Sequence, residues 1–176
     1  AILTDMEGQY GAGKYCNEAG VCKELQALEA VLAKSRDYDE LLDVWQGWRQ
    51  VSPPYRPQYQ RFVEIANQGA QDFGYRNLAE LWKGGYDMDS HTFTLEARGL
   101  WDQVKPFYDE LHCHVRAVLS ETYGPDKVSL DGPIPAHLLG NMWSQTWDNI
   151  YGIMEPYPGV SQVDITAALQ AREWDE

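Results

Sequence analysis

Apolar residues recur at helical spacing through most of this 176-residue chain, and this periodicity constrains the fold more than any other feature. The longest such segment runs from about Ser90 to Tyr123, and Gly124-Pro125 ends it. Pro106 predicts a kink or a break inside it. No two segments alternate convincingly as neighbouring strands do, so we expect an all-α fold.

Further helices are predicted where the same periodicity meets start and stop signals. Asp37, with Glu40 three residues later, is a candidate N-cap for a helix that ends near Arg49. Asn77 and Asp164 are expected to cap two shorter helices. The predicted spans are 38–49, 59–73, 78–83, 136–153 and 165–174, of which 136–153 is apolar on several faces and is expected to be central and buried.

The charge balance excludes some classes of partner. The chain has 14 Lys and Arg against 27 Asp and Glu, a formal net charge of −13, which repels nucleic acid and anionic lipid. No apolar run is long enough to span a bilayer, and no signal peptide is recognisable, so we expect no membrane segment. Hydrophobic residues make up 44% of the chain, which excludes a disordered acidic tail.

The three cysteines leave the redox compartment open. Cys16 and Cys22 flank a polar loop that contains Gly20, and they fit either a small disulfide ring in an oxidising compartment or two free thiols in a cytosolic protein. Cys113 lies in an apolar-periodic segment, so we expect it to be buried.

The residues by themselves present no complete catalytic constellation. None of the four histidines lies in a His-Glu-x-x-His pattern. His112 and His114 are two residues apart, so on a helix they point about 200° apart and cannot share a metal ion. The carboxylate clusters at 37–40 and 173–176 are interpreted as solvated faces, and the glycines at 8–13 lack the Lys-Ser/Thr ending of a phosphate loop.

Four stretches together resemble the angiotensin-converting enzymes, a family of zinc peptidyl-dipeptidases. They are Met6-Glu7 through Cys16 and Cys22; Ser35 to Leu42 with Trp45-Gln46-Gly47-Trp48-Arg49; Gly74-Tyr75 with Leu81 to Tyr86; and the run from Gly132 to Trp147, the most specific of the four. The resemblance extends over essentially all 176 residues.

The resemblance implies a large helical metallopeptidase with a deep central substrate channel, of which residues 1–176 are an incomplete portion of a single domain. The family's zinc ligands and its residues that stabilise the tetrahedral intermediate lie beyond Glu176, so this chain is expected to hold no catalytic residue and no metal ligand. The implied parent molecule is a secreted enzyme that removes C-terminal dipeptides from peptides. Its expected partners are a peptide with a free C-terminus and the remaining portion of the enzyme.

The resemblance also implies roles for particular residues. Gln145, with Thr146 beside it, matches the position that binds the C-terminal carboxylate of the substrate, and a side-chain amide suits that task because it donates without adding a charge. Glu7 matches a position near the pocket on the N-terminal side of the scissile bond. Without the flanking motif, Gln145 would be interpreted as a polar residue on a helix surface.

Arg49 and Tyr86 match one position in each of the family's two chloride sites, each completed by residues outside this chain. Arg49 could instead bind the last carbonyl groups of its own helix. Cys16 and Cys22 match the family's first disulfide. Gln26 departs from the acidic residue that family members often have near the pocket after the cleaved bond, so a preference there for a basic side chain is weakened.

A second interpretation is a non-catalytic homologue, in which the same helical domain acts as a binding or scaffold protein. An unrelated helical bundle would require the run from Gly132 to Trp147 to be coincidental. The presence or absence of zinc in the purified protein, together with its native mass, distinguishes the first two.

Overall fold

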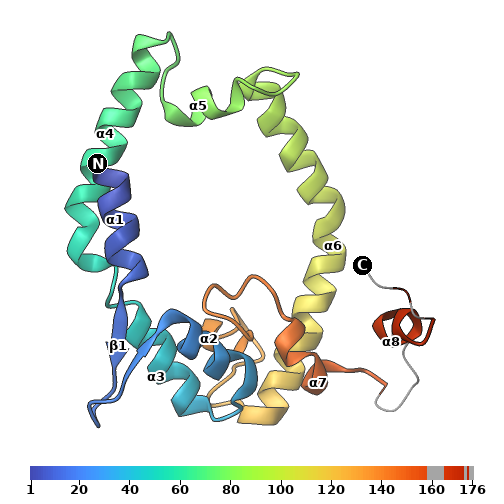
Figure 1. The fold of residues 1–176 in the computed structure, drawn as a ribbon. Helices are drawn as coiled ribbons and strands as arrows, with labels where there is room; N and C mark the ends of the chain where they lie inside the picture. Colours follow the sequence, from blue (N-terminus) through green and yellow to red (C-terminus); the bar gives the residue numbers. More distant parts are fainter. Residues whose placement is uncertain (158–164, 173, 175–176) are drawn as a thin grey trace.

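The computed structural model describes residues 1–157, 165–172 and 174, and the expected all-α class is confirmed. The longest elements are the helices α6, of 34 residues, and α4, of 17 residues (Figure 1). The described helices are α1 Ile2–Gly11, α2 Leu25–Lys34, α3 Tyr38–Trp48, α4 Arg56–Asp72, α5 Leu78–Lys83, α6 Ser90–Tyr123, α7 Tyr151–Met154 and α8 Ile165–Gln170, with short 3₁₀ turns at Pro53–Tyr55, Ala136–Leu138 and Asp148–Ile150.

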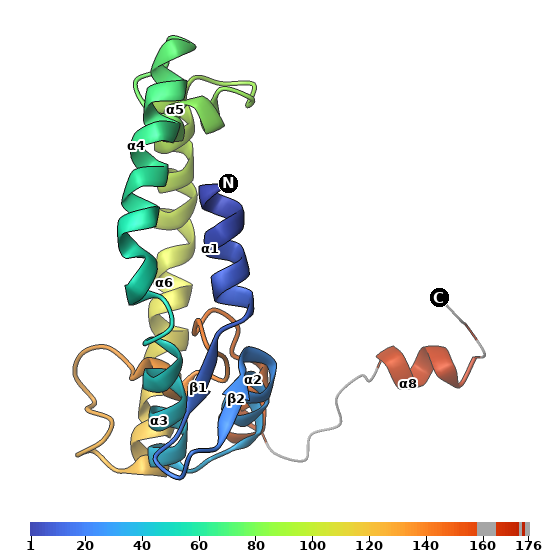
Figure 2. The ribbon, with the colours of Figure 1, turned by 60° about the vertical axis from the view of Figure 1, so that its left-hand side comes forward.

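The helices form two long arms on a common base. In Figure 1, α4 and α6 rise from the base and α5 connects them at the far end, while α1 lies along α4. Figure 2 shows α1 and α4 in front of α6, with α2, α3 and a strand pair below them. None of the described helices is both long enough and apolar enough to cross a lipid bilayer.

The hydrophobic core lies in the base, where segments far apart in the sequence meet. Leu28, Trp48 and Leu119 are almost completely buried there and come from α2, α3 and α6. Other members of this core are Leu32, Leu41, Val44, Val115, Val128, Ile134, Leu138, Leu139, Met142, Ile150 and Met154. This core therefore positions the segment that follows α6.

The predicted helix starts are confirmed at two caps. The Asp37 carboxylate accepts a hydrogen bond from the backbone N–H of Glu40, and Asn77 does the same for the N–H of Glu80. The cap expected at Asp164 lies outside the described residues. Of the kink or break expected at Pro106, the break is wrong: α6 continues through this residue, and Figure 1 shows the helix as curved.

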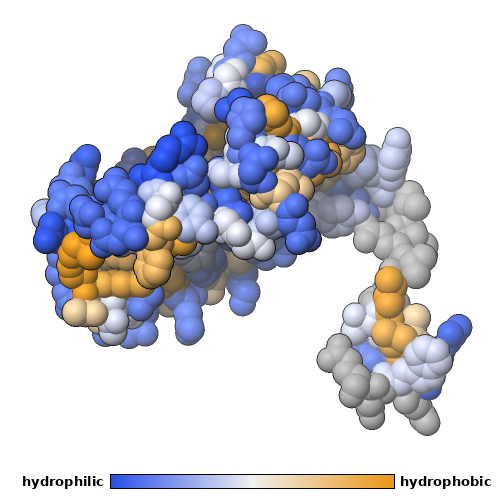
Figure 3. Space-filling view, turned by 90° about the horizontal axis from the view of Figure 1, so that it is seen from above, coloured by the Kyte–Doolittle hydropathy of each residue, from blue (hydrophilic) through white to orange (hydrophobic). Residues whose placement is uncertain are grey.

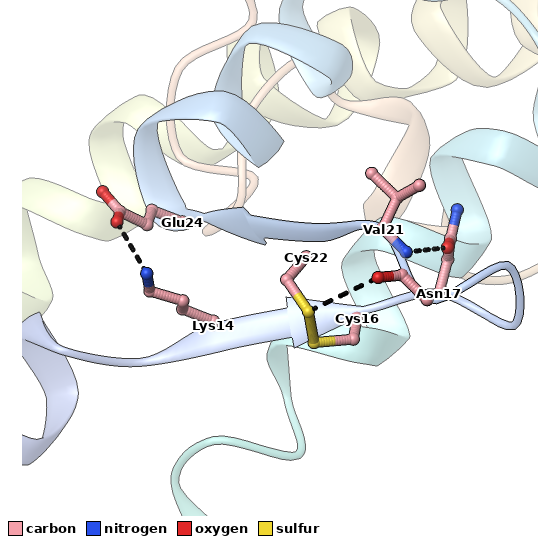
Figure 4. The surroundings of a disulfide bond; sticks show 7 residues. Lys14, Cys16, Asn17, Val21, Cys22 and Glu24 are labelled. Carbon is pink, nitrogen blue, oxygen red and sulfur yellow. Dashed lines mark hydrogen bonds and ion pairs between the residues drawn. A yellow bond between two sulfur atoms is a disulfide. The ribbon is translucent and has the colours of Figure 1, made fainter.

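A short strand pair corrects the expectation that the chain has none. β1, Lys14–Cys16, pairs antiparallel with β2, Cys22–Glu24, in a register that places Cys16 opposite Cys22. These two cysteines form a disulfide, as the resemblance implied, and the side chain of Asn17 accepts a hydrogen bond from the N–H of Val21 across the turn (Figure 4). Sequence periodicity missed the pair because three residues are too few for alternation to register.

The segment 136–153 is buried in part as expected, but it is not one helix. A 3₁₀ turn at Ala136–Leu138 leads into an irregular stretch, and only Tyr151–Met154 is α-helical. Gly140 has φ 85° and Ser144 has φ 58°, both in the left-handed region that an α-helix excludes. The pair Gly140-Asn141 is a turn signal that the apolar pattern outweighed in the prediction.

The apolar positions of α6 are buried only at its end in the base. Val115 and Leu119 are buried, whereas Leu100, Val104 and Phe107 are exposed, Phe107 by 72%. Cys113 is also exposed, so its expected burial is wrong. Seen from above, hydrophobic patches interrupt an otherwise hydrophilic surface (Figure 3).

Candidate functional site

The segment around Gln145 is a compact turn organised by one buried side chain, that of Asn141. The Asn141 amide nitrogen donates to the carbonyl oxygen of Thr146 at 3.1 Å and also to the Thr146 hydroxyl. Its amide oxygen accepts from the N–H groups of Trp143 at 3.0 Å and Gln145 at 3.3 Å. Asn141 is 7% exposed, and buried polar groups in proteins are normally hydrogen-bonded. Its amide nitrogen and its amide oxygen both form hydrogen bonds within this turn.

Ser144 and Trp147 close the same turn. The Ser144 hydroxyl donates to the carbonyl oxygen of Ala136 at 2.8 Å, and the Trp147 indole N–H donates to the carbonyl oxygen of Ser144 at 3.1 Å. The Asn149 amide donates to the carbonyl oxygen of Gly140 at 2.9 Å. Ser144 has a left-handed backbone conformation, which is strained for a residue other than glycine. These contacts hold it in that conformation.

Gln145 is exposed and lines a hollow of about 390 Å³ between this turn and α6. Tyr108 and Leu111 of α6, together with Trp147, line the same hollow. Among the residues that the structure describes, no hydrogen bond engages the side-chain amide of Gln145. The amide is therefore available to a ligand, beside an aromatic wall in which the Tyr108 and Trp147 ring centres are 6.2 Å apart.

Thr146 lies next to Gln145, but its hydroxyl accepts a hydrogen bond from Asn141. This contact ties Thr146 to the turn, so a structural role is enough to explain why a threonine stands at this position. A direct contact between Thr146 and a substrate stays a prediction.

Arg49 connects the end of α3 to the turn. Its guanidinium donates to the carbonyl oxygen of Met142 and lies over the Trp45 ring, 4.4 Å from the ring centre. The guanidinium of Arg49 therefore binds a carbonyl of the turn, and the alternative that it binds the last carbonyls of its own helix is wrong. The Trp45 indole nitrogen is buried without a hydrogen-bond partner among the described residues, which leaves a donor unused beside the cation.

Glu7 and Arg49 line one hollow of about 630 Å³ between α1, the Pro53–Tyr55 turn and the start of α4. Its other walls are mostly apolar or aromatic: Leu3, Met6, Tyr10, Pro53, Tyr55 and Tyr59. Glu7 is exposed, and no residue of the Gln145 hollow lines this one. The predicted substrate residues Glu7 and Gln145 are therefore in separate hollows.

Tyr86 lies between α5 and α6, at the end of the arms away from the base (Figure 1). Its ring stacks on Phe93, with ring centres 4.4 Å apart, and it is 56% exposed. The two predicted chloride residues are thus in different parts of the molecule, consistent with one residue for each of two sites.

The histidines of α6 diverge as helical geometry predicts. His112 contacts the rings of Tyr108 and Trp147, while His114 Nε2 lies 3.1 Å from the carbonyl oxygen of Met154. Within residues 1–157, 165–172 and 174, no three His, Cys, Asp or Glu side chains are grouped so that they could hold a metal ion.

His137 and Asn141 are two of the three buried polar residues among those described, the third being Ser120, and sequence reasoning assigned a role to none of them. His137 is 4% exposed against the edge of the Tyr38 ring, and burial lowers its pKa to about 4, although Asp39 opposes the shift. No pattern singled out His137. Asn141 had a signal, because it follows a glycine inside the most specific run of the chain.

Comparison with known proteins gives one consistent result. The sequence model of the peptidase family M2, angiotensin-converting enzyme, matches residues 1–176. The chain is 42% identical over 175 residues to the angiotensin-converting enzyme-like protein Ace3 of Mus musculus, covering 98% of this chain and 24% of that protein. It is 40% identical to the angiotensin-converting enzyme of Sus scrofa, with 98% and 13% covered, and 38% identical to that of Theromyzon tessulatum, with 96% and 28% covered. The chain thus spans between 13% and 28% of the length of these relatives.

Proposed function

Because the chain belongs to the angiotensin-converting enzyme family of peptidases, we propose that it is a portion of a secreted zinc peptidyl-dipeptidase, an enzyme that removes C-terminal dipeptides from peptides. Residues 1–176 would be an incomplete part of one helical domain. The portion would supply a wall of the substrate channel, an anchor for the substrate's carboxylate and ligands for chloride.

The observation that carries this proposal is the free amide of Gln145. It is exposed in a hollow, and the hydrogen bonds of Asn141 hold the backbone on both sides of it. A side-chain N–H aimed at a carboxylate forms a charge-assisted hydrogen bond, which is stronger than a neutral one. The aromatic wall beside it would contact the last side chain of the peptide, whereas Glu7, in a separate hollow, would contact a residue before the cleaved bond.

Chloride binding is proposed at Arg49 and at Tyr86. The guanidinium of Arg49 has the unpaired Trp45 N–H nearby, and a cation with an uncharged donor suits a dehydrated anion. The exposed Tyr86 ring offers one hydroxyl donor. Each site would be completed by residues outside this chain.

The remaining portion of the enzyme would also supply the zinc ligands. Among the described residues, no three His, Cys, Asp or Glu side chains are grouped so that they could hold a metal ion. The exposed apolar face of α6 is consistent with a neighbouring part of the same domain packing on it.

The test uses the purified protein that contains this chain. We expect it to hold zinc, to release dipeptides from a peptide with a free C-terminus, and to lose this activity with a chelator. Gln145→Ala should raise KM by about tenfold and change kcat less, because a binding contact is removed. Unchanged kinetics would remove the carboxylate role from Gln145, and a native mass near 20 kDa without zinc would favour a non-catalytic homologue.

A further inference from the structure

We infer that Asn141 is the positioning residue of the carboxylate anchor: it aims the Gln145 side chain without touching substrate. This inference rests on the proposed function, because it assumes that Gln145 is the group to be aimed. The structural basis is the concentration of hydrogen bonds on one buried amide within five residues of chain.

The backbone of Gln145 is held directly by Asn141. Asn141 Oδ1 accepts from the N–H of Gln145 itself, at 3.3 Å, and from the N–H of Trp143 two residues earlier, at 3.0 Å. The amide nitrogen of the same side chain holds Thr146 by its carbonyl oxygen and hydroxyl. The backbone is thereby clamped at Gln145 and on both sides of it.

The side chain of Gln145, by contrast, is held only through its backbone. Gln145 is exposed and its own amide has no hydrogen bond among the described residues, so nothing at its tip fixes the direction of the side chain. Its direction depends on the backbone, which includes the strained Ser144 immediately before it. Loss of the Asn141 hydrogen bonds would free the backbone at Trp143, Gln145 and Thr146 and move the anchor, and a misplacement of about 1 Å costs up to about a hundredfold in an aligned contact.

The burial of Asn141 keeps it away from a bound ligand. Asn141 is 7% exposed and lies between the core residues Leu139 and Met142, so its side chain stays on the protein side of the turn. An unpaired polar group at such a position is costly, which explains why both its donor and its acceptor are engaged. Asn141 therefore acts on a ligand only through Gln145.

The experiment compares binding of an N-acetylated tripeptide and of its C-terminal amide to the intact, chelator-treated protein, measured by calorimetry. The ratio of the two affinities isolates the carboxylate contact. We expect Gln145→Ala to lower this ratio about tenfold and Asn141→Ala to lower it about three- to tenfold. In the double variant, the second substitution should change nothing further, because both act through one contact.

Asn67→Ala is the matched control, since Asn67 also binds a backbone N–H, that of Leu78, but in the arms between α4 and α5. It should leave the ratio unchanged. If Asn141→Ala does not fold, Asn141→Ser retains a side-chain oxygen and takes its place. If Gln145→Ala lowers the affinity ratio but the substitution at Asn141 does not, the inference about Asn141 is overturned and the proposed anchor stands. Additive effects in the double variant have the same meaning. If Gln145→Ala leaves the affinity ratio unchanged, the proposed anchor is overturned as well.

Discussion

Gly47 shows how a single missing Cβ determines local packing. It lies in the last turn of α3, where the ring of Tyr15 from β1 covers it, and an added Cβ would lie 2.4 Å from three ring carbons. The Tyr15 hydroxyl donates to Asp43 one turn earlier, and this hydrogen bond, with burial, raises the pKa of Tyr15. The ring is therefore held in place and cannot move aside without losing that contact.

Gly47→Ala is expected to lower the free energy of unfolding by about 1–3 kcal/mol, because the overpacked ring must shift. Gly99→Ala in α6 is the control, since no atom lies within 4 Å of its added Cβ. That substitution should stabilise by up to about 1 kcal/mol through helix propensity. Urea unfolding measures both, and equal effects at the two glycines would contradict the steric explanation.

His137 couples stability to pH. Its pKa is lowered from 6.5 to about 4 by burial, so the folded state keeps it neutral where the unfolded chain takes up a proton. Stability from this group is complete above pH 6.5 and is lost as pH falls towards 4, by about 3 kcal/mol in total. Urea unfolding of wild type and His137→Leu between pH 7.5 and about 4.5 should show a smaller decrease for the variant; parallel curves would assign the pH dependence to other groups.

At the scale of elements, the hairpin of β1 and β2 depends on its disulfide, because strands of three residues are marginal on their own. Replacing both Cys16 and Cys22 by serine should lower the free energy of unfolding by about 2 kcal/mol, as expected for so short a loop. Cys113→Ser, at an exposed thiol, should change it by less than about 0.5 kcal/mol. If the double-serine variant is as stable as Cys113→Ser, the backbone hydrogen bonds between β1 and β2 are enough to maintain the hairpin without the disulfide.

The whole molecule is notable for how much of its longest helix is uncovered. Phe107 is 72% exposed and Val104 is 53% exposed, although both belong to the apolar periodicity of α6. Among the described residues of α6, only the end that carries Val115 and Leu119, near α7, joins the core. Such a face is typical of a surface that packs on another part of the protein.

In the full-length protein we expect Phe107→Ala to lower the free energy of unfolding by about 3 kcal/mol, a value typical of a buried ring rather than an exposed one. Phe73→Ala, at an 80% exposed ring on the end of α4, provides a comparison within the same arms. Hydrogen exchange of α6 in the same protein reports protection independently. A change below about 0.5 kcal/mol would mean that this face remains in contact with solvent.

Local sequence signals determined α3, α4, α5 and α6, because capping and periodicity act within a few residues, whereas α1 and α2 were not predicted. Asp37 and Asn77 cap where predicted, and α6 begins and ends where predicted. The pairing of Cys16 with Cys22 followed from family resemblance, while spacing alone left two possibilities. The same local rules failed at 136–153, where side chains replace helical hydrogen bonds. At Pro106 the helix continues without a break, although its residues there are exposed.

By itself, the sequence determined the helical class, the family and the identity of Gln145, Arg49, Tyr86 and Glu7 as candidates. Only the tertiary structure decided which of them share a hollow, because Glu7 and Arg49 meet between α1 and α4 while Gln145 faces α6. It also revealed Asn141, whose role consists of hydrogen bonds within an irregular turn. Such a turn follows no period, so its conformation is set by side-chain partners and core burial rather than by neighbouring residues alone.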